Sequence, residues 1–78
     1  MPRLPVVPGR EVLRLLLRYG CELKSVRGSH HNLLNPGTNM SSTVPIHGNR
    51  DLDRAFFADI LSQLGIDVGD FLDFMKNN

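Results

Sequence analysis

The amino-acid sequence predicts an α+β domain with the order α-β-β-β-α, followed by a last short helix, in which a three-stranded antiparallel sheet carries its helices on one face. Apolar residues recur at helical spacing toward both ends of the chain, and the stretch between them alternates as short strands. Glycine or proline stands at most of the junctions. Short strands in direct succession favour an antiparallel meander, and helices on one face leave the other side of the sheet open.

The first helix is expected over residues 10–19, after an extended lead-in over residues 1–8 that contains three prolines. Its apolar residues recur at helical spacing and are expected to face the core: Val12, Leu13, Leu16 and Leu17. Three basic residues, each four positions after the one before, form a separate stripe: Arg10, Arg14 and Arg18. Gly20 is expected to end this helix in a left-handed turn.

Three strands are expected between the helices, over residues 21–26, 29–34 and 40–46. Arg27-Gly28 is the expected turn between the first two strands, and Asn35-Pro36-Gly37 is the turn that ends the second. The third strand contains Pro45, which indicates its end or a sheet edge. Leu33 and Leu34 are both apolar, so alternation does not identify the buried face of the second strand.

A second helix is expected after His47-Gly48-Asn49 and up to Gly65, with Asp51 or Asn49 as its cap. Its expected core residues are Leu52, Phe56, Phe57, Ile60, Leu61 and Leu64. A last short helix, capped by Asp67, carries Val68, Phe71, Leu72 and Met75. Because the phenylalanines have core spacing, the sequence makes them poor candidates for base stacking.

The composition is that of a single soluble globular domain over residues 1–78. Hydrophobic residues make up 41% and charged residues 22% of the chain, which excludes an intrinsically disordered protein. The lone cysteine, Cys21, cannot form an intrachain disulfide, which fits a reducing compartment. The apolar runs are too short to span a membrane and no signal-peptide pattern opens the chain, so we expect a cytoplasmic protein without a membrane partner.

Charge is distributed unevenly along the chain, although its net value is only +1. Residues 1–50 contain seven basic and two acidic residues, whereas residues 51–78 contain two basic and six acidic ones. A basic region of this kind suits a phosphate-bearing partner such as RNA. Ordinary solvated faces produce the same pattern, and the arginine stripe could either grip RNA phosphates or only keep a surface helix soluble.

Three histidines are the residues best suited to chemistry: His30, His31 and His47. Histidine transfers protons readily near neutral pH, since its unperturbed pKa is about 6.5. RNA supplies its own nucleophile, the 2′-hydroxyl, so a histidine near that hydroxyl and basic side chains near the phosphate are sufficient for cleavage. Gly28 and Ser29 would let a phosphate approach the backbone beside His30. A histidine at the start of a strand is also common on protein surfaces without any chemical role.

Other uses of these residues fit their spacing less well. Adjacent strand residues point to opposite faces, so His30 and His31 cannot easily share a metal ion. Cys21 and His47 lack the usual spacing of zinc ligands, and Ser29 as a nucleophile has no visible third partner. No metal and no other cofactor is therefore expected.

Two histidine motifs occur in order along the chain, Gly28-Ser29-His30-His31 and Val44-Pro45-Ile46-His47-Gly48-Asn49-Arg50-Asp51-Leu52. Further matching segments accompany them: Leu4-Pro5-Val6-Val7, Gly9-Arg10-Glu11-Val12, Leu16, Gly20, Glu22-Leu23, Ile60-Leu61, Gly65-Ile66 and Phe71-Leu72. In this order the segments resemble the first and second halves of toxins of the HicA family. The resemblance covers nearly the whole chain.

The resemblance implies a double-stranded-RNA-binding-like fold and a metal-independent, ribosome-independent mRNA interferase, which is an endoribonuclease. It also implies a HicB-type antitoxin that binds and masks the toxin. By the same motifs His30 is the catalytic histidine, His31 is a bystander and His47 stabilises a turn. RNA contacts are expected from Arg10, Arg14, Arg18, Lys24, Arg27 and Ser29. The free toxin is expected to be a monomer.

The chain departs from the family pattern at the start of the second helix, and at Pro8, where a serine cap is common. At the start of the second helix, family members usually carry a glycine-threonine-leucine-arginine-like stretch. This chain has Ala55-Phe56-Phe57-Ala58 at the matching positions, after Asp53-Arg54. Because the related RNA-binding fold grips phosphates at that helix start, weaker RNA binding is expected. Three hypotheses stay open: an endoribonuclease toxin, an RNA-binding or partner-binding module of the same fold with weakened or lost catalysis, and a regulator that binds only its partner protein.

Overall fold

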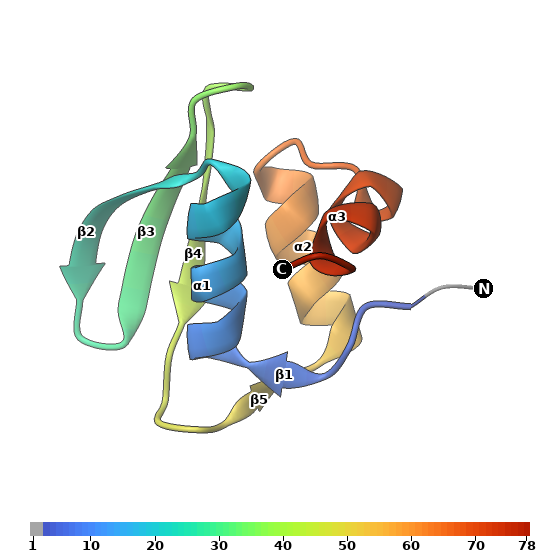
Figure 1. Cartoon of the computed structure of the whole chain (residues 1–78). Helices are drawn as coiled ribbons and strands as arrows, with labels where there is room; N and C mark the ends of the chain where they lie inside the picture. The colour runs from blue at the N-terminus through green and yellow to red at the C-terminus, as the bar shows by residue number, and fades with distance from the viewer. Residues whose placement is uncertain (1–2) are drawn as a thin grey trace.

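The computed structural model describes residues 3–78, so the first two residues of the expected lead-in lie outside the described part. The elements in chain order are β1 (Val7–Pro8), α1 (Gly9–Tyr19), β2 (Glu22–Arg27), β3 (His30–Asn35), β4 (Met40–Pro45), β5 (Asp51–Leu52), α2 (Arg54–Gln63) and α3 (Val68–Met75) (Figure 1). The strands β2, β3 and β4 form one antiparallel sheet with β3 in the middle. The predicted α+β class and the three-stranded meander are confirmed.

The turn between β2 and β3 differs by one residue from the expected Arg27-Gly28. Arg27 is the last residue of β2 and pairs with His30, so the two-residue turn is Gly28-Ser29. Gly28 has a φ of 58°, and two-residue hairpin turns of this kind favour glycine at their first central position. Consequently Ser29 belongs to the turn, and β3 begins at His30.

The register between β3 and β4 identifies the buried face that alternation alone left open. Leu33 pairs with Ser42 and His31 pairs with Val44, and both Leu33 and Val44 are buried. Directly opposed residues project on the same side of a sheet, so these four residues share the face that packs on the core. The even-numbered residues of β3, beginning with His30, project from the other face, which we call the open face.

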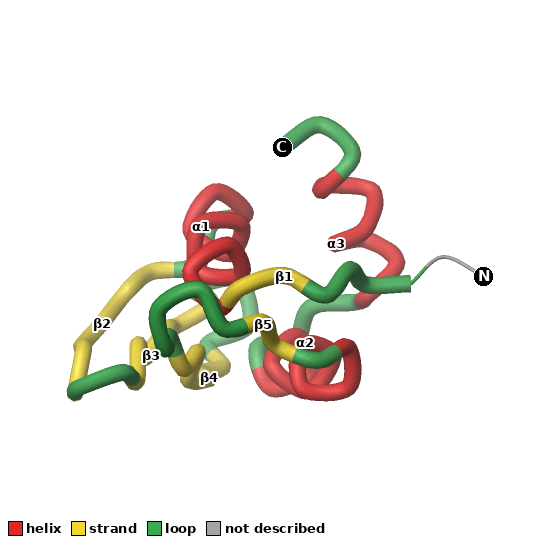
Figure 2. The backbone as a smooth tube through the Cα atoms, turned by 90° about the horizontal axis from the view of Figure 1, so that it is seen from below, coloured by secondary structure: helices red, strands yellow, loops and turns green. Residues whose placement is uncertain are grey.

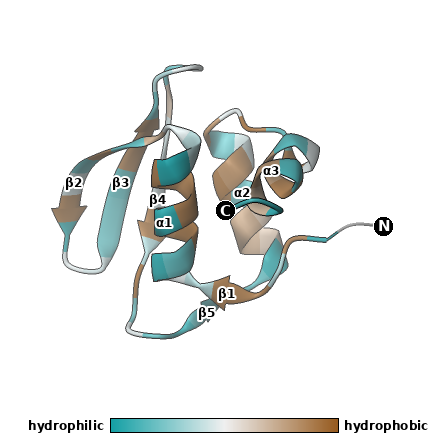
Figure 3. Ribbon diagram, in the orientation of Figure 1, coloured by the Kyte–Doolittle hydropathy of each residue, from teal (hydrophilic) through white to brown (hydrophobic). Residues whose placement is uncertain are grey.

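The helix α1 lies over the core side of the sheet, and α2 lies beside β4 (Figure 2). Figure 3 shows the hydrophobic stretches of the three helices and the hydrophilic first half of β3. The buried face of α1 holds Val12, Leu15 and Leu16, whereas the expected core residue Leu17 is 41% exposed. The apolar stripe of α1 that packs on the core is thus centred nearer Leu15 than the sequence predicted. Gly20, with a φ of 121°, ends α1 as predicted.

Two short strands, which the sequence does not predict, form a second sheet. β1 pairs with β5, with Val7 opposite Leu52 and Pro8 opposite Asp51. The last part of the lead-in is therefore a strand, and Leu52 belongs to β5 and not to the second helix. Next to this sheet, α1 begins at Gly9, where a Cβ atom would overlap the carbonyl oxygen of Pro45.

The cap of α2 is Asp53, and the predicted caps Asp51 and Asn49 are wrong. The Asp53 side chain accepts the backbone N–H of Phe56 at 2.8 Å, because α2 starts only after β5 has ended. Gly65, with a φ of 69°, follows the end of α2 as expected. Asp67 caps α3 as predicted and accepts the N–H of Asp70 at 3.1 Å.

An aromatic cluster joins the three helices on the core side. Tyr19 of α1 lies 5.2 Å from Phe71 and 5.0 Å from Phe74 of α3, and Phe57 of α2 lies 5.9 Å from Phe71, measured between ring centroids. These tilted and edge-on contacts are the favourable geometries for aromatic pairs. No helix within residues 3–78 is long and apolar enough to cross a membrane.

Candidate functional site

His30 is an exposed residue at the start of β3, immediately after the Gly28-Ser29 turn. Its cross-strand neighbours are Arg27 on β2 and Pro45 on β4. Because paired residues project from the same side of a sheet, the His30 imidazole and the Arg27 guanidinium share the open face. Within residues 3–78, neither side chain forms a hydrogen bond or an ion pair, so both are free for a ligand.

A row of hydrogen-bonded side chains crosses the open face next to His30. Asn32 donates its Nδ2 hydrogen to Ser25 Oγ at 2.8 Å, and Thr43 Oγ1 donates to Asn32 Oδ1 at 2.6 Å. The row connects all three strands and orients the amide of Asn32, which follows His30 on the same face. The surroundings of His30 are thus polar, and hydrogen bonds from two neighbouring strands fix the Asn32 side chain.

The other two histidines have different environments. His31 projects toward the core side and is partly buried, and its Nδ1 lies 3.0 Å from the carbonyl oxygen of Ser29. His47 is exposed, and the turn around it is closed by its backbone carbonyl, which accepts the N–H of Arg50 at 3.0 Å. The turn-stabilising hydrogen bond expected of His47 therefore comes from its backbone.

His30 and His31 project to opposite faces of β3, as the strand period predicts, and do not face a common ion. Across residues 3–78 there is no group of three or more histidine, cysteine, aspartate or glutamate residues that could hold a metal ion.

The structure separates the arginine stripe of α1 from His30. Arg10, Arg14 and Arg18 are exposed on α1, which covers the core side of the sheet, whereas His30 projects from the open face. Arg14 forms a two-pronged ion pair with Glu11, at 2.6 and 2.9 Å, and Arg18 donates to the side-chain oxygen of Asn78. The hydrogen bond from Arg14 lowers the pKa of Glu11, and the same bond raises the pKa of Arg14.

Of the other predicted RNA contacts, Arg27 and Ser29 lie beside His30 in the hairpin. Lys24 lies at a β-bulge between Leu23 and Ser25, and its Nζ is 2.8 Å from Glu22 Oε1. This exposed ion pair lies along the edge strand, away from the hairpin turn. Arg27 is thus the cation that the fold brings directly to His30.

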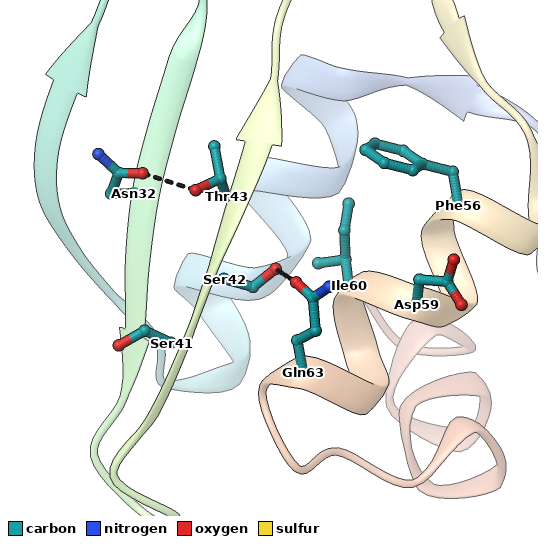
Figure 4. A pocket seen from close by; sticks show the side chains of 8 residues that line it. All are labelled: Asn32, Ser41, Ser42, Thr43, Phe56, Asp59, Ile60 and Gln63. Atoms are coloured by element: carbon teal, nitrogen blue, oxygen red, sulfur yellow. Dashed lines mark hydrogen bonds between the residues drawn. The ribbon is translucent and has the colours of Figure 1, made fainter.

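A cleft of about 550 Å³ lies between the open face of the sheet and α2 (Figure 4). Its sheet side includes Asn32 and Thr43, and its helix side includes Phe56 and Asp59. The expectation that the phenylalanines of α2 are core residues is wrong for Phe56, which is 40% exposed. Its neighbour Phe57 is the buried one, because Leu52 lies in β5 and the series of residues four apart that placed Phe56 in the core does not run along one helix.

The start of α2 offers little to a phosphate. Arg54, its basic residue, donates its Nε hydrogen to the carbonyl oxygen of Leu4 at 2.9 Å. The carboxylate of Asp53 caps the first turn, so a negative charge already lies at the positive end of the helix dipole.

Comparison with protein families gives one match, which covers residues 9–66 and is described as the HicA toxin of bacterial toxin-antitoxin. This match includes α1, the whole three-stranded sheet and α2. The chain belongs to the HicA toxin family. No curated protein and no solved structure matches the chain significantly.

Membership of the HicA family makes this protein a toxin of a toxin-antitoxin system, with an antitoxin as its partner. HicA toxins act in general as ribonucleases. His30, Arg27 and the cleft all lie within the matched segment, whereas α3 lies beyond it. The resemblance drawn from the two histidine motifs is confirmed at the level of the family.

Proposed function

We propose that this HicA toxin is a metal-independent endoribonuclease that cleaves mRNA, with His30 as its general acid and base. The observation that carries the proposal is the pairing of His30 with Arg27 across the hairpin, on an exposed polar face where neither side chain has another partner among residues 3–78. A proton-transferring group beside a cation is the minimum that RNA cleavage through the 2′-hydroxyl requires.

In the proposed reaction the imidazole of His30 takes the proton from a ribose 2′-hydroxyl, and the 2′-oxygen attacks the adjacent phosphorus. The bond from phosphorus to the 5′-oxygen of the next nucleotide breaks, and the imidazolium returns the proton to that oxygen. The products are a 2′,3′-cyclic phosphate and a 5′-hydroxyl end. Arg27 would stabilise the charge on the phosphate oxygens, and the Gly28-Ser29 turn would let the phosphate approach the backbone.

A longer RNA would also contact Arg10, Arg14, Arg18 and Lys24 through its phosphates. Because the arginine stripe and His30 lie on different sides of the sheet, an RNA that reaches both has to pass around the edge strand β2. All six residues of β2 are exposed, so such a path is open.

For the partner we propose an acidic HicB-type antitoxin that covers His30 and the arginine stripe in the cytoplasm, where the free toxin is a monomer. To cover both, such an antitoxin would extend around the edge strand β2, as the RNA would. An exposed edge strand also offers unpaired backbone groups with which a partner can form hydrogen bonds.

A second candidate is a binding module of the same fold with weakened catalysis. It is favoured by the start of α2, where Arg54 is held by Leu4 and Asp53 supplies a negative charge. A protein of this kind would bind RNA or the antitoxin without cleaving RNA.

The deciding experiment compares the wild type with His30→Ala, and uses His47→Ala as a matched control because His47 is also exposed. We expect growth arrest on expression, and RNA cleavage in EDTA that leaves 5′-hydroxyl ends, for the wild type and His47→Ala. His30→Ala should lose both activities and keep its thermal melt and its antitoxin binding. Full cleavage by His30→Ala, or cleavage that requires an added metal, contradicts the proposed mechanism.

A further inference from the structure

The cleft beside α2 opens on the same face of the sheet as His30. Asn32, which lines its floor, follows His30 by two residues on β3, a separation of about 7 Å along a strand. A strand of RNA with its scissile phosphate at His30 would therefore bring a neighbouring nucleotide to the cleft. The volume of about 550 Å³ is within the range of small-molecule sites.

On the α2 side, the wall of the cleft includes an aromatic, an acidic and an amide side chain. Phe56, Asp59 and Gln63 lie at positions i, i+3 and i+7, so they project from one side of the helix. Figure 4 shows the Phe56 ring turned toward β4 and the Gln63 side chain reaching Ser42. An exposed aromatic ring beside polar groups is the usual arrangement for holding an unpaired base, which stacks on the ring and hydrogen-bonds through its edge.

The hydrogen-bonding groups of this stripe have a defined order. The hydroxyl of Ser42 donates to Gln63 Oε1, so the amide oxygen is occupied and the NH₂ group of Gln63 is left as a donor. One helical turn away, the Asp59 carboxylate is exposed and can only accept. Along α2 the cleft thus offers one donor followed by two acceptor oxygens.

We propose that this cleft binds a guanine base of single-stranded RNA next to the cleavage site. Guanine presents an acceptor, O6, followed by two donors, N1–H and the N2 amino group, and this order complements Gln63 and Asp59. Uracil presents one donor between two acceptors, and adenine presents one donor beside an acceptor. Cytosine presents one donor followed by two acceptors, which is the pattern of the cleft itself. Phe56 stacks on the face of the base, and Asp59 contacts the base and not a phosphate. The inference rests on the proposed function for its RNA substrate.

The test measures binding of four pentaribonucleotides, UUNUU with each of the four bases at N, made with 2′-O-methyl riboses so that they cannot be cleaved. We expect the wild type to bind the guanine form most tightly. Phe56→Ala should weaken binding of all four by about 5- to 150-fold, the range for loss of one stacking ring, and Phe56→Tyr should restore it. Asp59→Asn should reduce the preference for guanine by about tenfold or more, since it removes a hydrogen bond to a charged group.

Matched controls separate these effects from general changes of surface. Asp73→Asn makes the same charge change on α3, where Asp73 is exposed beside Lys76. Leu17→Ala removes an apolar side chain that is 41% exposed, as Phe56 is 40% exposed, on the other side of the sheet. Both controls should keep the binding and the guanine preference of the wild type.

The possible results distinguish the cleft from the catalytic proposal. Equal binding of all four oligonucleotides, or variants that behave like their controls, overturns the guanine site and leaves cleavage by His30 standing. Guanine-selective binding that depends on Phe56 and Asp59, in a protein that does not cleave RNA, supports the cleft and refutes the proposed function. Variants that weaken only antitoxin binding assign the cleft to the antitoxin and contradict our proposal.

Discussion

Two adjacent histidines in β3 have different surroundings because successive residues of a strand project to opposite faces. His31 turns toward the core and lies against the Ser29 carbonyl, whereas His30 shares the open face with Arg27. Strand alternation predicted that the two histidines face opposite sides, but only the Gly28-Ser29-His30-His31 motif indicated which of them is the candidate for catalysis. At the residue scale, the geometry of the hairpin supplies the physical difference that spacing alone did not.

Arg27→Ala should lower the rate of RNA cleavage by about 10²- to 10³-fold, the usual effect of removing one group that stabilises developing charge. The thermal melt should not change, because Arg27 is exposed and has no hydrogen bond or ion pair within residues 3–78. Lys76→Ala, which removes a positive charge from an exposed residue at the end of α3 outside the proposed RNA contacts, is the control for initial rates and should cleave normally. An Arg27→Ala protein as fast as this control would remove Arg27 from the site.

Cys21 is buried, and burial raises the pKa of its thiol. We therefore expect iodoacetamide to modify the folded protein slowly and the urea-unfolded protein quickly, since the thiolate is the reactive form. Because the folded-state pKa is the higher one, the unfolded chain releases this proton first, and stability should fall as the pH rises above the unfolded value near 8.5. Urea titrations between pH 7 and 9.5 measure this loss, and Cys21→Ala should have a weaker pH dependence.

At the scale of elements, single residues at the ends of helices predicted the ends of α1 and α2 and the cap of α3, although the cap of α2 was misplaced. Gly20 and Gly65 end helices with positive φ angles, and Asp67 caps α3, as local propensity requires. β1 and β5 escaped prediction because two residues are too few to show a period, and their pairing joins distant parts of the chain. Phe56 was misassigned because the expected helix included Leu52, which shifted the apolar stripe by one position.

Asp53→Ala should lower the free energy of unfolding by about 1 kcal/mol, because it removes the cap of the Phe56 N–H. Asp51→Ala is the control, since Asp51 has the same charge, is exposed and lies in β5 next to the helix start. Chemical denaturation of both variants measures the difference. If Asp51→Ala proved to be the more destabilising change, the assignment of the cap to Asp53 would be wrong.

At the scale of the whole molecule, the sheet divides the basic surface into two parts. His30 and Arg27 project from the open face, and the arginine stripe lies on α1 on the other side. The uneven charge that was visible in the sequence is therefore spread over two sides of a molecule with extents of 35 × 28 × 21 Å. The sequence could not reveal that the basic residues lie on two sides of the molecule. Which side of the sheet α1 covers, and which residues of β3 project from the other side, is determined only by packing.

This division predicts that the salt dependence of RNA binding changes with RNA length. Each phosphate contact contributes a slope of about −0.7 for single strands, so Arg27→Ala should flatten the slope by roughly one contact for any RNA. Arg14→Ala should do so only for RNA of about 20 nucleotides, which can pass around β2, and not for a pentamer. Titrations of both lengths at several salt concentrations give the slopes. A pentamer slope that depends on Arg14 would mean that the RNA lies on α1.

The pairing of β1 with β5 also affects the order in which the protein can fold during its synthesis. Val7 and Leu52 are 45 positions apart, so a ribosome that adds about 5 to 20 residues per second makes the second roughly 2 to 9 s after the first. The hairpin that holds Arg27 and His30 needs only neighbouring residues and can close within about a second of its synthesis. The two strands of the histidine hairpin are thus made together, whereas the pairing of β1 with β5 and the α2 wall of the cleft have to wait for residues that are added seconds later.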